Sequence, residues 1–179
     1  SSFDDMVAAL RKRHDFFAEQ VLKLAAKEEF EYAEVDELGT VVEKDYTPYH
    51  IDQVLALKLV NRDAIAQADL KVVVDAVNSV GGVVIPALLR ALGVKEIIEL
   101  NCEPTGHFAH NPEPIPENLT QIAAKMKESR ADLGIVVDPD VDRLALISEN
   151  GEMFGEEYTL VAVADYVLKH TPGNTVSNL

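Results

Sequence analysis

The chain has 179 residues, of which 47% are hydrophobic, so it can form one full domain with a substantial core and further segments. Its formal net charge of −15 and sequence pI near 4.6 argue against nucleic acid and anionic membrane surfaces as partners. No apolar run could span a bilayer, no signal-peptide pattern is present, and the single cysteine, Cys102, excludes an intramolecular disulfide, so we expect a cytoplasmic protein.

The two ends of the chain look like cuts in a longer polypeptide. No initiator Met precedes Ser1, and a strand that begins within residues 175–179 has no partner after it. We therefore expect the chain to be an excerpt from a longer protein.

The first third of the chain is predicted to be helical. One apolar stripe repeats at spacings of three and four residues with His14 on the same face, which is typical of a helix that packs against a core or another domain. A coiled coil of about three heptads remains an alternative. We expect a structural role for His14, because no Cys, His or carboxylate lies near it at ligand spacing. The stripe consists of Phe3, Met6, Val7, Leu10, Phe17, Val21 and Leu24.

A connector is predicted at residues 45–49, because Pro48 disfavours helix at Thr47. It follows an acid-rich stretch at residues 27–37 and precedes a helix predicted from about Ile51 to Ala66.

From Leu70 onward, strands and helices are predicted to alternate. An apolar run at 71–77 predicts a buried strand, Gly81-Gly82 predicts the turn before a helix, and Gly93 predicts a left-handed cap at the end of that helix. This order predicts an α/β fold with three layers, α/β/α, around a mostly parallel sheet with an antiparallel edge strand. The other predicted elements are helices at 83–92 and 119–129, strands at 95–100 and 133–137, and the edge strand at 144–148.

The hexapeptide 138–143, Asp-Pro-Asp-Val-Asp-Arg, directly follows the apolar strand at 133–137. Alternate side chains of an extended strand lie about 7 Å apart, too far to share one ion, so the loop must curl to bind a cation. Oxygen-only ligands in small number suit Mg²⁺, and Arg143 adds a group that can bind phosphate. Ligands of open α/β sheets bind at the carboxyl ends of strands, which independently favours a functional site here.

Two other interpretations of the hexapeptide compete with the Mg²⁺ loop. In an EF-hand, Asp138, Asp140 and Asp142 would take positions one, three and five and Glu149 position twelve, but position six needs Gly and is Arg143. A solvated acidic turn, the usual fate of clustered Asp, stays open from spacing alone.

Two further motifs are weaker candidates for ligand sites. Gly81-Gly82 precedes a helix, as phosphate-binding loops do, but it lacks the fuller glycine fingerprints, so tight-turn geometry is favoured. His107 and His110 suggest a zinc site with nearby acids, yet their spacing without helix context favours an exposed loop. The acids concerned are Glu103, Glu113 and Glu117.

Three motifs together resemble the second domain of the α-D-phosphohexomutases, the family of phosphomannomutases, phosphoglucomutases and phosphoglucosamine mutases. They are the loop 138–143, the stretch 73–82 (Val-Val-Asp-Ala-Val-Asn-Ser-Val-Gly-Gly) and the stretch 111–119 (Asn-Pro-Glu-Pro-Ile-Pro-Glu-Asn-Leu). The resemblance implies three parts: residues 1–47 as the helical tail of the first domain, 48–150 as the metal-binding α/β second domain, and 151–179 as the start of the third.

The resemblance implies a four-domain isomerase of carbohydrate metabolism, an intramolecular phosphotransferase. Such an enzyme interconverts hexose 1-phosphate and hexose 6-phosphate through a bisphosphorylated sugar, and a phosphoserine of the first domain donates the phosphoryl group. By the same resemblance Asp138, Asp140 and Asp142 are the Mg²⁺ ligands, and Arg143 contacts the phosphate or orients the loop. The implied partner is a phosphosugar.

Parts of the family's pattern do not occur in this chain. The phosphoserine motif is absent, since Ala109 stands where the nucleophile would precede His110-Asn111-Pro112, and the fourth domain has no counterpart. We therefore expect the chain alone to be inactive and to bind Mg²⁺ weakly. The choice of hexose is not readable from these residues. The alternative from a different class is a non-enzymatic α/β module with a structural cation site.

Overall fold

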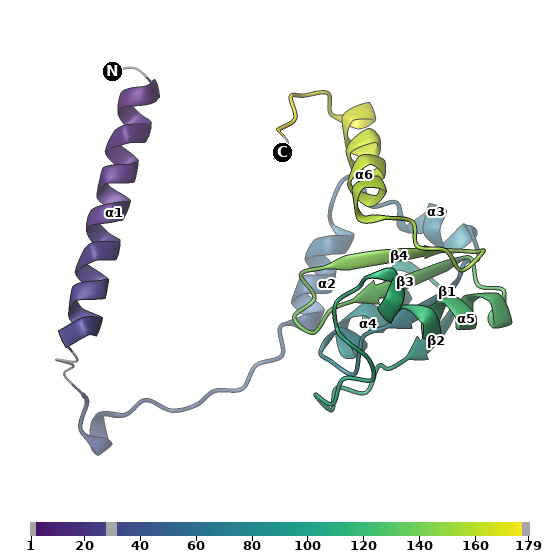
Figure 1. The fold of residues 1–179 in the computed structure, drawn as a ribbon, viewed down its shortest axis with the longest axis horizontal. Helices are drawn as coiled ribbons and strands as arrows, with labels where there is room; N and C mark the ends of the chain where they lie inside the picture. Colours follow the sequence, from purple (N-terminus) through teal and green to yellow (C-terminus); the bar gives the residue numbers. More distant parts are fainter. Residues whose placement is uncertain (1–2, 28–31, 177–179) are drawn as a thin grey trace. The chain divides into compact units, whose positions relative to one another are not determined.

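The computed structural model describes residues 3–27 and 32–176, without the side chains of residues 3–11, 14, 156 and 157. The chain divides into two compact units, Ser1–Lys44 and Asp45–Leu179. Figure 1 shows the sheet and most helices in the second unit.

In its described residues, the first unit contains helix α1 (Phe3–Lys27) and the 3-10 turn η1 (Val35–Glu37). The predicted first helix is therefore confirmed. The apolar side chains described in its second half are 57–68% exposed, so their packing partner stays a prediction, and the side chain of His14 lies outside the described residues. These exposed side chains are Phe16, Phe17, Val21, Leu22 and Leu24.

The second unit is built on a four-stranded sheet in the order β2-β1-β3-β4. β1 pairs in parallel with both β2 and β3, and β4 pairs antiparallel with β3. This arrangement confirms the predicted mostly parallel sheet with an antiparallel edge. The strands are β1 (Lys71–Asp75), β2 (Glu96–Leu100), β3 (Leu133–Val137) and β4 (Leu144–Ser148).

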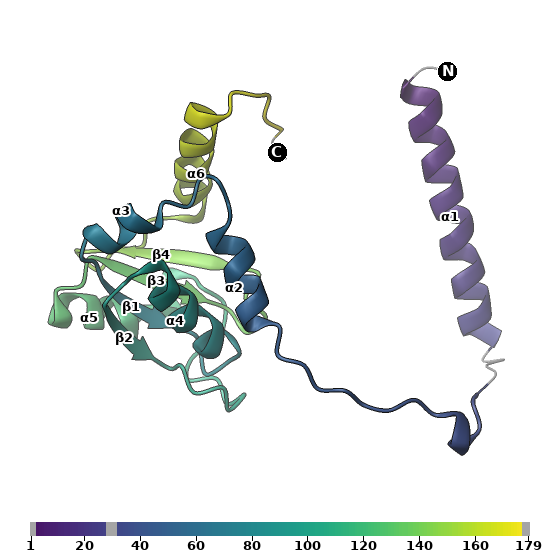
Figure 2. The same cartoon turned by 180° about the vertical axis from the view of Figure 1, so that it is seen from behind.

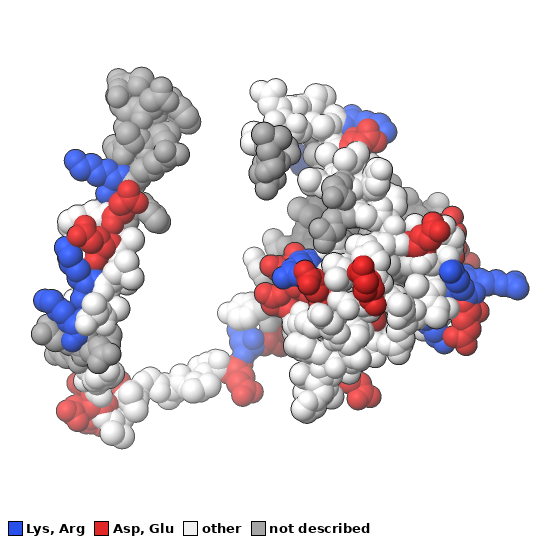
Figure 3. Space-filling model, in the orientation of Figure 1, with Lys and Arg blue, Asp and Glu red and all other residues white. Residues whose placement is uncertain are grey.

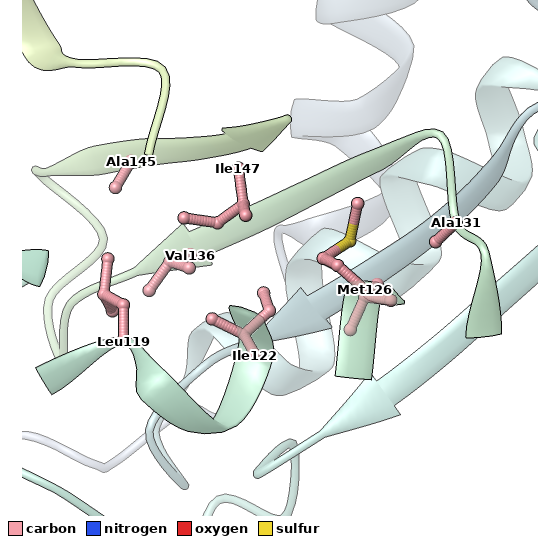
Figure 4. Packing of buried hydrophobic residues seen from close by; sticks show 8 residues of the cluster. Leu119, Ile122, Met126, Ala131, Val136, Ala145 and Ile147 are labelled. Carbon is pink, nitrogen blue, oxygen red and sulfur yellow. The ribbon is translucent and has the colours of Figure 1, made fainter. Parts of the chain in front are cut away.

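Helices cover both faces of the sheet, as the two views in Figures 1 and 2 show. On one face, α5 (Thr120–Ser129) contributes Ile122 and Met126 to the cluster of apolar side chains drawn in Figure 4. On the other face, α4 (Gly81–Leu92) and α3 (Arg62–Gln67) pack against the alternate residues of β1. The three-layer α/β/α prediction is confirmed. Because β1 is buried on both faces, it carries a run of valines rather than an alternating pattern.

The glycines at the start of α4 allow a close approach of the chain. A Cβ on Gly82 would lie 2.1 Å from the carbonyl oxygen of Cys102, and one on Gly81 would lie 2.5 Å from a methyl group of Val137. These distances support the structural role predicted for Gly81-Gly82. At the other end of α4, Gly93 has φ of 97° and caps the helix in the left-handed conformation, as predicted.

The single helix predicted over 51–66 is wrong. Two helices stand there, α2 (Thr47–Leu55) and α3, separated by residues 56–61. The break has a local cause, because the Asn61 side chain accepts a hydrogen bond from the Ala64 amide at 3.0 Å and so starts a new helix. The connector predicted at 45–49 is also too long, since Pro48 lies in the first turn of α2, where it costs no hydrogen bond.

Beyond β4 the chain folds back along the outer side of that strand. The Ser148 amide donates to the Glu152 carbonyl and the Phe154 amide to the Leu146 carbonyl, both at 2.8 Å, and Ile147 pairs with Met153. Helix α6 (Glu156–His170) follows, and a 3-10 turn, η2 (Pro116–Asn118), precedes α5. Across the described parts of the chain, no helix combines the length and apolarity that crossing a bilayer requires.

Candidate functional site

The β3–β4 loop, residues 138–143, lies at the carboxyl edge of the parallel strands. It begins at Asp138, directly after β3, and Asp75 ends the neighbouring strand β1. Figure 3 shows acidic and basic side chains gathered near the left end of β4, where this loop lies. The position agrees with the general location of ligand sites in open α/β sheets.

The loop is curled by hydrogen bonds within itself. One carboxylate oxygen of Asp138, Oδ1, accepts from the amides of Asp142 and Arg143, each at 3.1 Å. The Asp138 carbonyl accepts from the Val141 amide at 3.2 Å, and Val141 has φ of 61°. A β-branched residue in the left-handed region is strained, so the surrounding contacts must enforce this turn.

The curl brings the three predicted metal ligands together. One carboxylate oxygen from each of Asp138, Asp140 and Asp142 lies within 4.8 Å of the others. Asp138 is 4% exposed, whereas Asp140 and Asp142 face solvent. A cluster of hard oxygen donors with one buried and two accessible members fits Mg²⁺, which keeps several waters and few protein ligands. The loop joins two strands, which excludes the helix-flanked EF-hand.

The pKa values of Asp138 and Asp142 are shifted in opposite directions. Burial raises the pKa of Asp138. The hydrogen bond from the Arg143 amide, hydrogen bonding with the side chains of Asp142 and Asp140, and the positive charge of Arg143 outweigh burial and lower that pKa below its ordinary value. The charge of Asp140 raises the pKa of Asp142, and hydrogen bonding and the charge of Asp138 add to this. The loop therefore holds mutually repelling negative charge that a cation would relieve.

Arg143 lies among three carboxylates. Its Nε is 3.6 Å from Asp138 Oδ2 and 3.9 Å from Asp142 Oδ1, and one terminal nitrogen is 3.8 Å from Glu113 Oε1. Its side chain is 52% exposed, so it can also reach a ligand. A cavity of about 220 Å³ opens beside it, lined by Asn111, Pro112, Glu113, Asp138, Pro139 and Arg143.

A second polar group at the same edge was not predicted from the sequence. The Asp75 carboxylate is fully buried and lies 3.2 Å from His110 Nε2. The exposed-loop interpretation is therefore wrong for His110, whose side chain is 15% exposed. Within the described residues, the only group of three acidic, His or Cys side chains at metal-binding distance is the Asp triad, so the zinc interpretation gains no support. The one sequence signal was the carboxylate of Asp75 directly after a run of three valines.

Comparison with known proteins gives the family. A family model described as phosphoglucomutase/phosphomannomutase, alpha/beta/alpha domain II, matches residues 48–151. The chain belongs to the phosphoglucomutase/phosphomannomutase family. This confirms the resemblance to the phosphohexomutases.

Relatives named as sugar-phosphate mutases cover most of the chain. This chain is 36% identical over 165 residues to a phosphoglucomutase/phosphomannomutase of Thermococcus kodakarensis. The alignment covers 92% of this chain and 35% of that protein. A probable phosphoglucosamine mutase of Methanopyrus kandleri is 35% identical over 84% of this chain and 33% of its own length. A crystal structure of a phosphoglucomutase/phosphomannomutase family protein from Burkholderia thailandensis superposes with a TM-score of 0.67 at 29% identity, over 87% of this chain and 32% of that one. The chain thus spans about a third of the length of these relatives.

Proposed function

We propose that this chain carries the Mg²⁺ centre of an enzyme that interconverts hexose 1-phosphate and hexose 6-phosphate through a bisphosphorylated sugar. The observation that carries the proposal is the convergence of three carboxylates within 4.8 Å at the carboxyl edge of the sheet, in a chain of the phosphoglucomutase/phosphomannomutase family. Phosphoryl transfer requires mainly positioning and neutralisation of charge, and this edge supplies groups for both.

The charged residues of the loop have two roles in this proposal. Asp138, Asp140 and Asp142 hold Mg²⁺, which when bound neutralises charge on the transferring phosphoryl group. Asp138 also maintains the curl of the loop through its two amide hydrogen bonds. Arg143 contacts the phosphate, and its half-exposed guanidinium beside the cavity supports this role because a planar guanidinium can donate two parallel hydrogen bonds to phosphate oxygens.

We infer that residues 48–150 correspond to the second domain of the family, with 1–47 ending the first domain and 151–179 beginning the third. The chain spans about a third of its relatives, so the phosphoserine and the remaining substrate contacts are expected on other parts of the full protein. The 179-residue chain alone is therefore expected to be inactive toward a phosphosugar.

The test is mutase activity of the full-length protein that contains this chain, with glucose, mannose and glucosamine 1-phosphates, in Mg²⁺ and after chelation. We expect turnover that requires the metal and falls by at least about 100-fold in Asp140→Ala, the upper range for groups that support a metal site. Glu149→Gln is the matched control, since it removes an exposed charge just beyond β4, and full activity is expected. Turnover that survives both chelation and Asp140→Ala would refute the metal centre, and a cation-dependent rise in stability without turnover would favour a structural cation site.

A further inference from the structure

A chain of polar contacts ties the segment 101–119, between β2 and α5, to the end of β1. The side-chain nitrogen of Asn101, Nδ2, lies 3.2 Å from both Asp75 oxygens and 3.0 Å from Gln121 Oε1 in the first turn of α5. The Val77 amide donates to Asp75 Oδ1 at 3.1 Å. On its other oxygen, Oδ2, Asp75 meets His110 Nε2 at 3.2 Å.

His110 is held through both of its ring nitrogens. Its Nδ1 lies 2.8 Å from the carbonyl oxygen of Asn111, and its Nε2 lies 3.2 Å from Oδ2 of Asp75. The Val77 amide and the Asn101 side-chain nitrogen also donate to Asp75, so this buried carboxylate has partners on both of its oxygens. The contact thus ties His110 to a fully buried acid.

The residues that follow His110 form one wall of the cavity beside the Asp loop. Asn111, Pro112 and Glu113 face Asp138 and Arg143 across it. Glu113 reaches Arg143 at 3.8 Å, and the Glu113 amide is held by Asn111 Oδ1 at 3.1 Å. His110 is therefore the anchor next to this wall, because its side chain contacts Asn111 on one side and Asp75 of β1 on the other.

We propose that the Asp75–His110 contact is a positioning device for the metal site: it fixes residues 111–113 against the Asp loop and so keeps Arg143 between Asp138 and Glu113. This inference rests on the proposed function only in taking residues 138–143 as the metal loop. His110 touches neither the triad nor the reacting groups, so its effect on metal affinity is smaller than the about 10–100-fold typical of groups bonded directly to ligands.

The first measurement is the ¹⁵N spectrum of the His110 ring in the labelled 179-residue chain at neutral pH. The proposal requires a hydrogen bond between Nε2 and Asp75, so the Nε2 signal should shift in Asp75→Asn. An Nε2 signal that is the same in both proteins would overturn the contact.

The second measurement uses Mn²⁺ alone as a paramagnetic probe, added in trace amounts to the same chain. In the wild type we expect line broadening of the amides of Asp140 to Arg143 and also of Asn111 and Glu113. His110→Phe should lose the broadening at 111 and 113 and keep it at 140–143, and His110→Gln, which retains a donor toward Asp75, should restore it. Broadening at 111 and 113 that persists in His110→Phe would refute the proposal.

A matched control separates positioning from general loss of stability. Leu89→Ala creates a cavity on the opposite face of the sheet, in the cluster that α4 covers, and should leave the broadening pattern unchanged. Equal losses in Leu89→Ala and His110→Phe would overturn the positioning role.

Failure of the metal site itself gives a different result. Mn²⁺ that broadens nothing at 140–143 in the wild type would contradict the proposed Mg²⁺ centre. The positioning role is then decided without metal by the Nε–H signal of Arg143, which must shift in His110→Phe and not in Leu89→Ala. An unshifted signal in both variants would refute it.

Discussion

Two loops meet at the carboxyl edge of the sheet, and they are held in opposite ways. The loop 138–143 is held by its own residues, since Asp138 accepts hydrogen bonds from amides four and five residues ahead. The segment 101–119 is held from outside, by Asp75 of β1 and Gln121 of α5. The difference teaches that one wall of the cavity keeps its shape locally, while the other depends on residues far away in the chain.

The largest expected effect comes from removing the outside anchor. Asp75→Ala leaves His110 without its partner and takes the acceptor from Val77 and Asn101, so we expect a loss of about 3 kcal/mol in the free energy of unfolding. Hydrogen exchange should accelerate in residues 101–119 and stay unchanged in 138–143. Urea unfolding and exchange measured by NMR check this.

Asp132→Ala is the control for that prediction. Its carboxylate also accepts a backbone amide, from Lys71 at 2.7 Å, but it is exposed, so we expect a loss of only about 1 kcal/mol. Equal losses in the two variants would contradict the special role of the buried acid.

The second prediction tests the backbone contact between Gly82 of α4 and Cys102 at the start of segment 101–119. Gly82→Ala places a Cβ 2.1 Å from the carbonyl oxygen of Cys102, and neither group can move without shifting α4 or the end of β2. We expect a loss of about 2–3 kcal/mol by urea unfolding, after the gain that Ala gives a helix. Gly173→Ala, where nothing lies within 4 Å, should stay within about 0.5 kcal/mol of the wild type, and a similar loss there would refute the contact as the cause.

Two carboxylates of the loop 138–143 should change stability with pH in opposite directions. The pKa of Asp138 is lowered by folding, so its contribution is present above its unfolded value and is lost as pH falls through the lower folded value. Without divalent cations, Asp138→Ala should cost about 2 kcal/mol at neutral pH, and the difference should shrink in acid.

Asp142 provides the matched opposite case. Its pKa is raised by folding, so stability falls as pH rises from the unfolded value through the folded one. Asp142→Asn should therefore increase stability at neutral pH, and the gain should disappear in acid. Thermal unfolding across pH in the presence of a chelator measures both variants, and changes of the same sign would contradict the assignment.

The smallest expected effect concerns Cys102, which lies in segment 101–119 just after the end of β2. Burial, together with the negative charges of Glu99 and Asp75, raises the pKa of its thiol to about 11. Since the thiolate is the reactive form, alkylation by iodoacetamide should be slow at neutral pH and keep rising to about pH 11. Glu99→Gln should shift the rate profile to lower pH, and an unchanged profile would contradict the contribution of that charge.

The fold and the Asp loop could be predicted because their signals are local in the sequence. A run of valines gives β1, Gly93 ends α4, and the six residues 138–143 contain both the three clustered carboxylates and the hydrogen bonds that curl the loop. The break between α2 and α3 was missed because the cap at Asn61 interrupts an otherwise continuous apolar pattern.

The environment of His110 could not be predicted for a different reason. Its partner Asp75 lies 35 residues away, on a strand whose position beside segment 101–119 follows only from the sheet order. The spacing of His110 to neighbouring acids suggested either a zinc site or an exposed loop. Neither interpretation includes its contact with Asp75 at the end of β1. Local chemistry is readable from the chain, whereas long-range pairing between single polar residues needs the fold.

The two outer strands carry a consequence for self-association. β2 carries Glu96 and Glu99 at one border of the sheet, and at the other border residues 152–154 pair with the Ser148 amide and the Leu146 carbonyl of β4. Charged or already paired borders resist the strand-by-strand addition that builds open-ended aggregates. Both borders of this sheet therefore resist the addition of further strands, and we expect the folded unit to stay free of fibrils at high concentration.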